Sequence, residues 1–205
     1  MGNTVPFADL FRVLSDAHLF AGGDATLPML QCVRLEASET QLVAVATDRF
    51  LVGVARTDNY EGAAFTANVP LSFVKQVLKA WRPLKRMMWR ADVEVTETEV
   101  VFTLPDGQSM SHRLSDFEFV KWRALFQGVE GSSDSPAVLG LNPAYFAKFA
   151  KVESARHVVW RTSAARPNLV TIGSNFQGLL MPVRLEEAQK EDVLTDWMSE
   201  LVTSG

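Results

Sequence analysis

The sequence has 205 residues, of which 47% are hydrophobic and 21% charged, and its formal net charge is -4. This composition is that of a globular chain long enough to bury a core, and it excludes disordered, collagen-like and coiled-coil proteins. No apolar run approaches the ~20 residues of a membrane span, the first residues lack the features of a secretory signal, and the single cysteine, Cys32, cannot build a disulfide framework. We therefore expect a cytoplasmic protein.

The N-terminal segment predicts one helix followed by three strands. Apolar residues recur at helical spacing over 6–20, and Gly22-Gly23 ends the helix. Strands are expected over 29–37, 41–47 and 50–56, with Ser38-Glu39-Thr40 as the first turn. Three neighbouring strands of this kind form a meander.

The same order begins again at residue 64. A short strand over 64–69 leads to Pro70, which suits the first position of a helix that Pro83 ends. Strands follow over 86–96, 99–104 and 108–114, and Pro105-Asp106-Gly107 is a turn sequence between the last two. This is a second helix-plus-three-strands unit.

A third unit follows a polar, glycine- and serine-rich linker over 129–136. It predicts a strand over 137–141, a helix over 142–152 with Asn142 as N-cap, and strands over 157–163, 168–173 and 178–185. Since no such unit buries its apolar face alone, neighbouring units must share cores. The expected fold class is α+β, with antiparallel sheets backed by helices.

The last segment, 186–205, differs in character. It holds six acidic residues and one lysine, which leaves the rest of the chain nearly neutral. Val193, Leu194, Trp197, Met198 and Leu201 form the stripe of an amphipathic helix. This helix either covers a nearby binding site, packs on a neighbouring chain, or caps an exposed sheet.

A search for catalytic patterns favours a binding protein over an enzyme. The sequence has no glycine-rich phosphate loop, no HExxH and no paired-cysteine motif, and its three histidines show no ligand spacing. Asp48-Arg49 is either an acid–base pair or, as charges at a turn more often are, a structural pair. We therefore expect no catalytic residue, no metal and no cofactor.

Three segments together resemble the bacterial DNA polymerase III beta subunit, the sliding clamp, in its actinobacterial form. The first is 24–56, with the strings TLPML and ATDRF, and the second is 113–126, RLSDFEFVKWRALF. The third is 142–185, with NPAYF, RPNLV and the closing LLMPVRL. The sequence departs from the clamp pattern at Phe50 and Leu51, where a basic residue is common, and at Phe126, where a proline is usual.

The resemblance implies a shortened clamp of about one and a half domains. Residues 1–128 resemble the middle domain, 137–185 resemble the end of the third domain, and 186–205 have no counterpart. A family domain is two such units side by side, and three domains form half of a two-chain ring around DNA. With parts missing, we expect a homo-oligomer whose ring, if one forms, closes by head-to-tail contacts.

The resemblance also implies a pocket for short apolar peptides between the first and the last unit. Leucine, methionine, valine and proline would supply an apolar slot, and Asn142, Tyr145 and Arg184 would supply hydrogen bonds at its rim. From composition alone, the same residues read as a shared core. The pocket residues that the resemblance implies are Leu30, Thr47, Leu51, Val52, Asn142, Tyr145, Pro167, Leu179, Met181, Pro182, Val183 and Arg184.

Weak, non-specific contact with duplex DNA is the second implied activity. In clamps the helices face the central hole and offer scattered basic groups to the phosphates. The corresponding residues here are Arg12, Lys75, Lys79, Arg82, Lys85, Arg86, Lys148 and Lys151.

The expected function is that of a non-catalytic processivity factor, a phage-like sliding clamp that tethers a replication or repair polymerase to DNA. Its expected partners are a polymerase or other clamp-binding protein, duplex DNA and a clamp loader, with no membrane. The alternative is a monomeric decoy or adaptor that binds clamp partners without encircling DNA. A third reading is an unrelated α+β interaction domain.

Overall fold

The computed structural model describes residues 3–24, 26–127, 129, 138–153, 158–162, 166–186 and 198. The linker expected over 129–136, apart from Val129, lies outside the described residues. So does the acidic segment 186–205, apart from Glu186 and Met198. The described part contains three units of the expected kind.

The first unit begins with a short strand that runs directly into a helix. The helix α1 buries a continuous apolar side, and its last residues tighten into a 3₁₀ turn before Gly22. Three antiparallel strands follow. The elements are β1 (Thr4–Pro6), α1 (Phe7–Ala17), η1 (His18–Phe20), η2 (Pro28–Leu30), β2 (Cys32–Ala37), β3 (Leu42–Thr47) and β4 (Leu51–Thr57).

The second unit repeats this order, and again a proline stands between the leading strand and the helix. Pro6 and Pro70 both have φ near the fixed value of the proline ring, which allows the chain to pass from strand to helix in one step. The elements are β5 (Phe65–Pro70), α2 (Leu71–Trp81), η3 (Arg82–Leu84), β6 (Arg90–Val95), β7 (Glu99–Thr103) and β8 (Ser109–Arg113).

The third unit is shorter in the described residues. Asn142 caps its helix by accepting a hydrogen bond at Oδ1 from the Ala144 amide, 2.9 Å away. A short helix, α3 (Trp122–Phe126), precedes this unit. The elements of the third unit are α4 (Pro143–Phe149), β9 (Val158–Arg161), β10 (Asn168–Ile172) and β11 (Phe176–Leu180).

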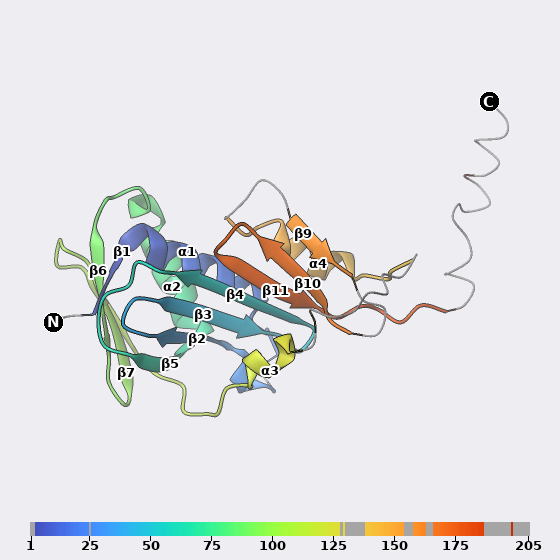
Figure 1. The fold of residues 1–205 in the computed structure, drawn as a ribbon. Coiled ribbons are helices and arrows are strands. Elements are labelled where there is room, and N and C mark those ends of the chain that lie inside the picture. The colour runs from blue at the N-terminus through green and yellow to red at the C-terminus, as the bar shows by residue number, and fades with distance from the viewer. Residues whose placement is uncertain are drawn as a thin grey trace.

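The strands form two antiparallel sheets. One has the order β1-β6-β7-β8, and the other has seven strands in the order β5-β2-β3-β4-β11-β10-β9. Figure 1 shows the smaller sheet at one end of the molecule and the third unit at the other. Because β4 pairs with β11, the third unit extends the sheet of the first.

Apolar side chains pack on both faces of the seven-stranded sheet. On one face they join α1, α2 and Phe149 of α4 to the smaller sheet, and we call this group the helix-side core. On the other face Val52, Leu169 and Leu179 pack with Phe119 and with partly buried residues of the chain after β8. We call residues 115–127 the outer strap, because they cross this second face.

Two glycines lie opposite each other where β4 meets β11. Gly53 is paired with Gly178. A Cβ on Gly53 would lie 2.2 Å from the Phe20 ring, and a Cβ on Gly178 would lie 2.6 Å from the Phe149 ring. The rings of Phe20 and Phe149 themselves are 4.9 Å apart. The glycines therefore make room for the aromatic contact that joins the first and third units.

The α+β class with antiparallel sheets is confirmed, and the differences from the sequence prediction are local. The chain forms a strand over Thr4–Pro6, α1 ends at Ala17, and residues 28–30 form a 3₁₀ turn where a strand is expected. Pro70 ends β5 and precedes the helix that it was expected to begin. Over 138–141 the only described pairing is the bridge between Gly140 and Val183, so the strand expected over 137–141 does not appear there.

Candidate functional site

The turn between β3 and β4 shapes one side of the candidate site. One carboxylate oxygen of Asp48 accepts hydrogen bonds from the amides of Phe50 (3.1 Å) and Leu51 (2.8 Å). The Thr47 hydroxyl donates to the Leu51 carbonyl oxygen at 2.6 Å. Arg49 adopts a φ of 81°, which is uncommon for a residue with a side chain. This tight turn projects Phe50 outward.

The other carboxylate oxygen of Asp48 binds the third unit. It lies 2.9 Å from Nζ of Lys148 on α4, and both side chains are mostly buried, with 13% and 25% of their area exposed. Asp48 therefore links the turn to the helix as well as holding the turn. Asp48 thus has a structural role, and its ion pair is with Lys148 in place of the expected Asp48-Arg49 pair.

The chain after β11 completes the site. We call this site the seam; it consists of Phe50 of the turn, Tyr145 of α4, and Met181, Val183 and Arg184 after β11. The Met181 amide donates to the Phe50 carbonyl oxygen, and the Val183 amide donates to the Gly140 carbonyl oxygen, both at 2.9 Å. The rings of Phe50 and Tyr145 stack with their centroids 5.6 Å apart. Phe50, Met181 and Val183 have 46%, 41% and 49% of their surface exposed. The seam thus presents large apolar side chains to solvent.

The structure divides the implied pocket residues into two groups. Asn142, Tyr145, Pro167 and Pro182 are half-buried, and Arg184 is exposed like Met181 and Val183. The remaining residues are buried: Leu30, Thr47, Leu51, Val52 and Leu179. Leu51 belongs to the helix-side core, whereas Val52 and Leu179 pack under the outer strap. The exposed members, which lie at the seam, are the ones open to a ligand.

Phe50 is the main seam residue that sequence reasoning missed as a contact. The clamp resemblance marks it only as a departure from the family pattern. Its exposure and its stack on Tyr145 give the seam an aromatic surface. The available signal was an aromatic residue at the tip of a tight turn, where solvent usually favours polar side chains.

Glu36 of β2 fastens the outer strap to the sheet. Its carboxylate accepts hydrogen bonds from Arg34 Nε (2.8 Å) and Trp122 Nε1 (3.2 Å) and forms a 2.6 Å ion pair with Arg123. Burial acts to raise the pKa of Glu36, but these hydrogen bonds outweigh burial and the pKa lies below its usual value. A cleft of about 500 Å³ opens beside this cluster, between β2 and α3.

A basic row on α2 is the best-placed part of the implied DNA surface. Lys75 and Lys79 are exposed one helical turn apart, and Arg82 follows at the end of the helix. They line a groove of about 330 Å³ together with Phe11 and His18 of the first unit. Burial lowers the pKa of His18, which keeps its ring neutral near pH 7. The positive charge of this groove therefore comes from its lysines and arginine.

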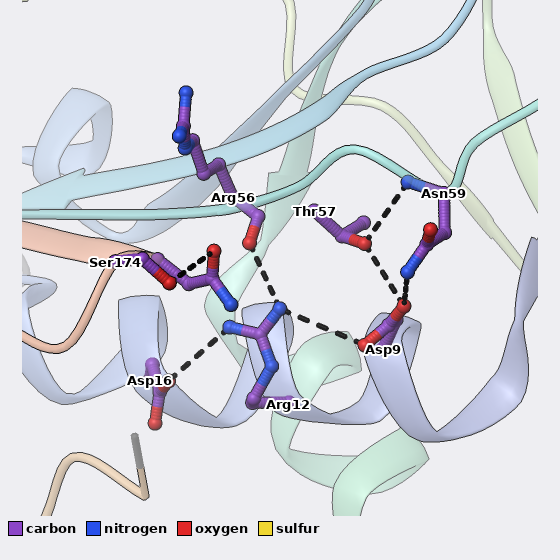
Figure 2. A network of polar contacts seen from close by, with 8 residues as sticks. Asp9, Arg12, Asp16, Arg56, Thr57, Asn59 and Ser174 are labelled. Atoms are coloured by element: carbon purple, nitrogen blue, oxygen red, sulfur yellow. Dashed lines mark hydrogen bonds and ion pairs between the residues drawn. The ribbon is translucent and has the colours of Figure 1, made fainter. Parts of the chain in front are cut away.

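Arg12 is held inside the protein by a polar network. Its guanidinium donates to the Arg56 carbonyl oxygen at 2.8 Å and lies 3.7 Å from Asp9 and 3.9 Å from Asp16 (Figure 2). Asp16 also accepts a hydrogen bond from the Glu153 amide. These contacts join α1 to β4 and to the third unit, so Arg12 has a structural role in this arrangement.

The other implied DNA residues differ in their surroundings. Lys85 is exposed and lies 3.7 Å from the Glu153 carboxylate, whereas Lys148 is the seam lysine described above. Arg86 and Lys151 are exposed. The eight residues implied for DNA binding therefore differ in how accessible they are to a phosphate group.

Among the described residues, no group of three or more histidine, cysteine, aspartate or glutamate side chains is placed to hold a metal ion. Within the same part of the chain, no helix is long and apolar enough to cross a bilayer.

Comparison with known proteins identifies relatives of the fold. Neither a protein-family model nor a curated protein sequence matches the chain. Among solved structures, a DNA polymerase sliding clamp from Pseudomonas aeruginosa has a TM-score of 0.77 and 13% identity, over 90% of this chain and 67% of that chain. The sliding clamp of Bacillus subtilis has a TM-score of 0.75 and 18% identity, over 91% and 65%.

The DNA polymerase III beta subunit of Thermotoga maritima is similar in the same way, with a TM-score of 0.76 and 13% identity, over 91% and 66%. This chain therefore spans about two thirds of the length of the clamps that it matches. At such low identity the agreement concerns the fold. The described chain has the fold of part of a bacterial DNA polymerase sliding clamp.

Proposed function

We propose that this protein is a non-catalytic clamp-type tether that holds a replication or repair enzyme at duplex DNA. One observation carries the proposal: the seam leaves Phe50, Met181 and Val183 exposed beside the half-buried Tyr145. The resemblance to sliding clamps implies a peptide-binding pocket at this place. An apolar surface with a few polar groups at its edge suits a short apolar peptide.

The residues of the seam have complementary roles in this proposal. Phe50 and Tyr145 form a rigid aromatic wall, because stacking restricts both rings. Met181 is unbranched and adapts to peptide side chains of different shapes. The exposed guanidinium of Arg184 is available to peptide carbonyl or carboxylate oxygens.

Peptide titration tests the docking part of the proposal. A fluorescent peptide from a bacterial replicative polymerase is titrated with the wild-type protein and with Met181→Ala while its anisotropy is followed. We expect the Kd of the variant to be about tenfold higher, since truncating a central apolar contact costs about 1.4 kcal/mol of binding free energy.

Met88→Ala is the matched control, because Met88 is fully exposed, outside the seam. It should bind the peptide as the wild type does. Equal affinities for wild type and Met181→Ala, or no binding by either, would overturn peptide docking at the seam.

One observation supports the adaptor alternative: several of the basic residues implied for DNA binding already lie beside carboxylates. Arg12 and Lys148 are already paired with carboxylates, and Lys85 lies beside Glu153. These contacts reduce the charge that is available to phosphates. Peptide binding without any measurable DNA binding at low salt would identify the protein as such an adaptor.

A further inference from the structure

The first and second units complete each other by exchanging their leading strands. β1 leads into α1 but pairs with β6 of the second unit, and β5 leads into α2 but pairs with β2 of the first. α2 also packs on β2 and β5. Each unit therefore closes the sheet edge of the other. The first strand after a unit's own helix, β2 or β6, is packed against the helix of the other unit, which we call the sister unit.

The third unit has no such sister among the described residues. β9 is its first strand and lies at the edge of the seven-stranded sheet, where its only described strand partner is β10. The residues leading into α4 are paired elsewhere, through the bridge from Gly140 to Val183. Among the described residues, no strand and no helix occupies the positions next to β9 that the other unit fills in the first two units.

The exposure of Phe146 marks the same vacancy on the helix. Phe146 is the fourth residue of α4, and the fourth residues of α1 and α2 are Leu10 and Val74. Leu10 and Val74 are completely buried, but 47% of the Phe146 surface is exposed. The fourth helix position, which is buried in the first two units, is therefore exposed in the third.

The exposed side chains of β9 continue this surface. Val158 and Trp160 pair with Ile172 and Val170, which belong to the helix-side core. Val158 is 41% exposed, and the Trp160 ring lies 5.3 Å from the Phe146 ring. In the first unit β2 holds the position that corresponds to β9, and its residues Val33 and Leu35 of the helix-side core are fully buried. We call Phe146, Val158 and Trp160 the open end of the core.

We propose that a second copy of this chain covers the open end, so that two third units pack against each other across a twofold axis with α4 beside α4, as α1 lies beside α2. The exchange between the first two units is reciprocal, and a reciprocal contact between identical units is an isologous twofold contact. The third unit offers an open edge at β9 and an uncovered helix, but its leading residues pair with Val183 through Gly140, so the contact involves the helices and the β9 edges and no exchange of leading strands. Burying Phe146, Val158 and Trp160 from each copy places a compact apolar centre in the interface.

This interface uses other side chains than peptide docking. The seam lies where β11 meets β4, whereas Val158 and Trp160 of the open end lie on β9, at the opposite edge of the third unit. On α4 the seam uses Tyr145 and the open end uses Phe146. Loss of one activity with retention of the other therefore distinguishes a failure of this inference from a failure of the proposed function.

Sedimentation equilibrium of the full chain over 1–100 µM is the first test, a range chosen as roughly that of weak to moderate dimers. We expect the wild type to form a dimer and Phe146→Glu to raise its Kd at least about tenfold, because a charge would be buried at the apolar centre. Met88→Glu adds the same charge at a fully exposed methionine outside the open end and should dimerise as the wild type does.

Cross-linking tests the twofold arrangement without disturbing the apolar centre. Phe11 and Lys75, the fifth residues of α1 and α2, line the same groove. If two α4 helices pack as α1 and α2 do, the twofold axis brings together the two copies of Ala147, the fifth residue of α4. Ala147→Cys should give a covalent dimer with a short bis-maleimide, whereas Met88→Cys should not. Cys32 is buried and does not compete.

Three results would overturn the inference. The first is a monomer at all concentrations, and the second is a dimer that Phe146→Glu leaves unchanged. The third is an assembly that keeps growing with concentration while Ala147→Cys fails to cross-link. The last pattern would indicate head-to-tail contacts in place of the twofold.

Discussion

At the scale of single residues, the seam depends on Asp48. One of its oxygens holds the turn that projects Phe50, and the other binds Lys148 of the third unit. Because Asp48 both holds the turn and ties it to α4, it sets the position of the Phe50 ring that stacks on Tyr145.

Glu36 provides a pH-dependent contribution to stability. Its pKa in the folded protein is lowered, so its stabilising effect is fully present above its unfolded pKa of about 4.3 and is lost as the pH falls through the folded value. We expect Glu36→Gln to lower the free energy of unfolding by about 1–2 kcal/mol at pH 7, because charge-assisted hydrogen bonds to the outer strap are weakened.

Urea unfolding of wild type and Glu36→Gln at pH 7 and pH 3 measures this effect. The difference should shrink as the pH is lowered from 7 to 3, because protonation of the wild-type carboxyl group makes it resemble the amide. Glu94→Gln, at an exposed position of β6, is the control and should show no difference at either pH. A gap between wild type and Glu36→Gln that is equal at both pH values would contradict this assignment.

At the scale of elements, the joint between β4 and β11 is the least tolerant place for a larger residue. A Cβ on Gly53 would meet three atoms of the Phe20 ring within 3 Å, and that ring is fixed by Phe149 and Phe176. We expect Gly53→Ala to lower the free energy of unfolding by about 1–3 kcal/mol, the usual cost of overpacking a core.

Gly23→Ala is the matched control, because nothing lies within 4 Å of a Cβ at that position. It should be neutral or stabilise the protein by up to about 1 kcal/mol, since alanine restricts the unfolded chain. Thermal unfolding of the three proteins, followed by circular dichroism, gives the comparison. Equal melting temperatures would mean that Phe20 moves aside without cost.

The sequence predicts the repeated elements well because their apolar periodicity is local information. Helix α2 shows this, since Leu71, Val74, Val77, Leu78 and Trp81 are all buried as its spacing indicates. The exchange of β1 and β5 between sheets is not predictable in this way, because partner choice depends on contacts distant in the chain. Thr4–Pro6 is also too short to show a strand period.

The candidate site shows the same limit. The clamp resemblance implies two neighbouring residues of β4, Leu51 and Val52, as pocket residues. Only the structure shows that Leu51 lies in the helix-side core and Val52 under the outer strap, on opposite faces of the sheet. It also shows Lys148 engaged with Asp48, a residue 100 positions away in the sequence. Long-range ion pairs of this kind leave no local pattern in the chain.

At the scale of the whole molecule, the charge distribution limits where the proposed contact with DNA can lie. The net charge is -4, so binding must come from a local concentration of basic groups, and the groove beside Lys75, Lys79 and Arg82 is such a place. Contacts of this type are to phosphates and carry no sequence preference. Their signature is a strong dependence of affinity on salt.

The test compares wild type with Lys75→Ala/Lys79→Ala by anisotropy of a labelled DNA duplex at several salt concentrations. Each phosphate contact adds about 0.9 to the slope of log K against log salt, so the double variant should lose about 1.8 from that slope. Arg113→Ala/Lys121→Ala removes the same charge from exposed positions on β8 and before α3, and should keep the wild-type slope. If both double variants shift equally, the affinity depends on overall charge, and the helical groove is not the surface that meets DNA.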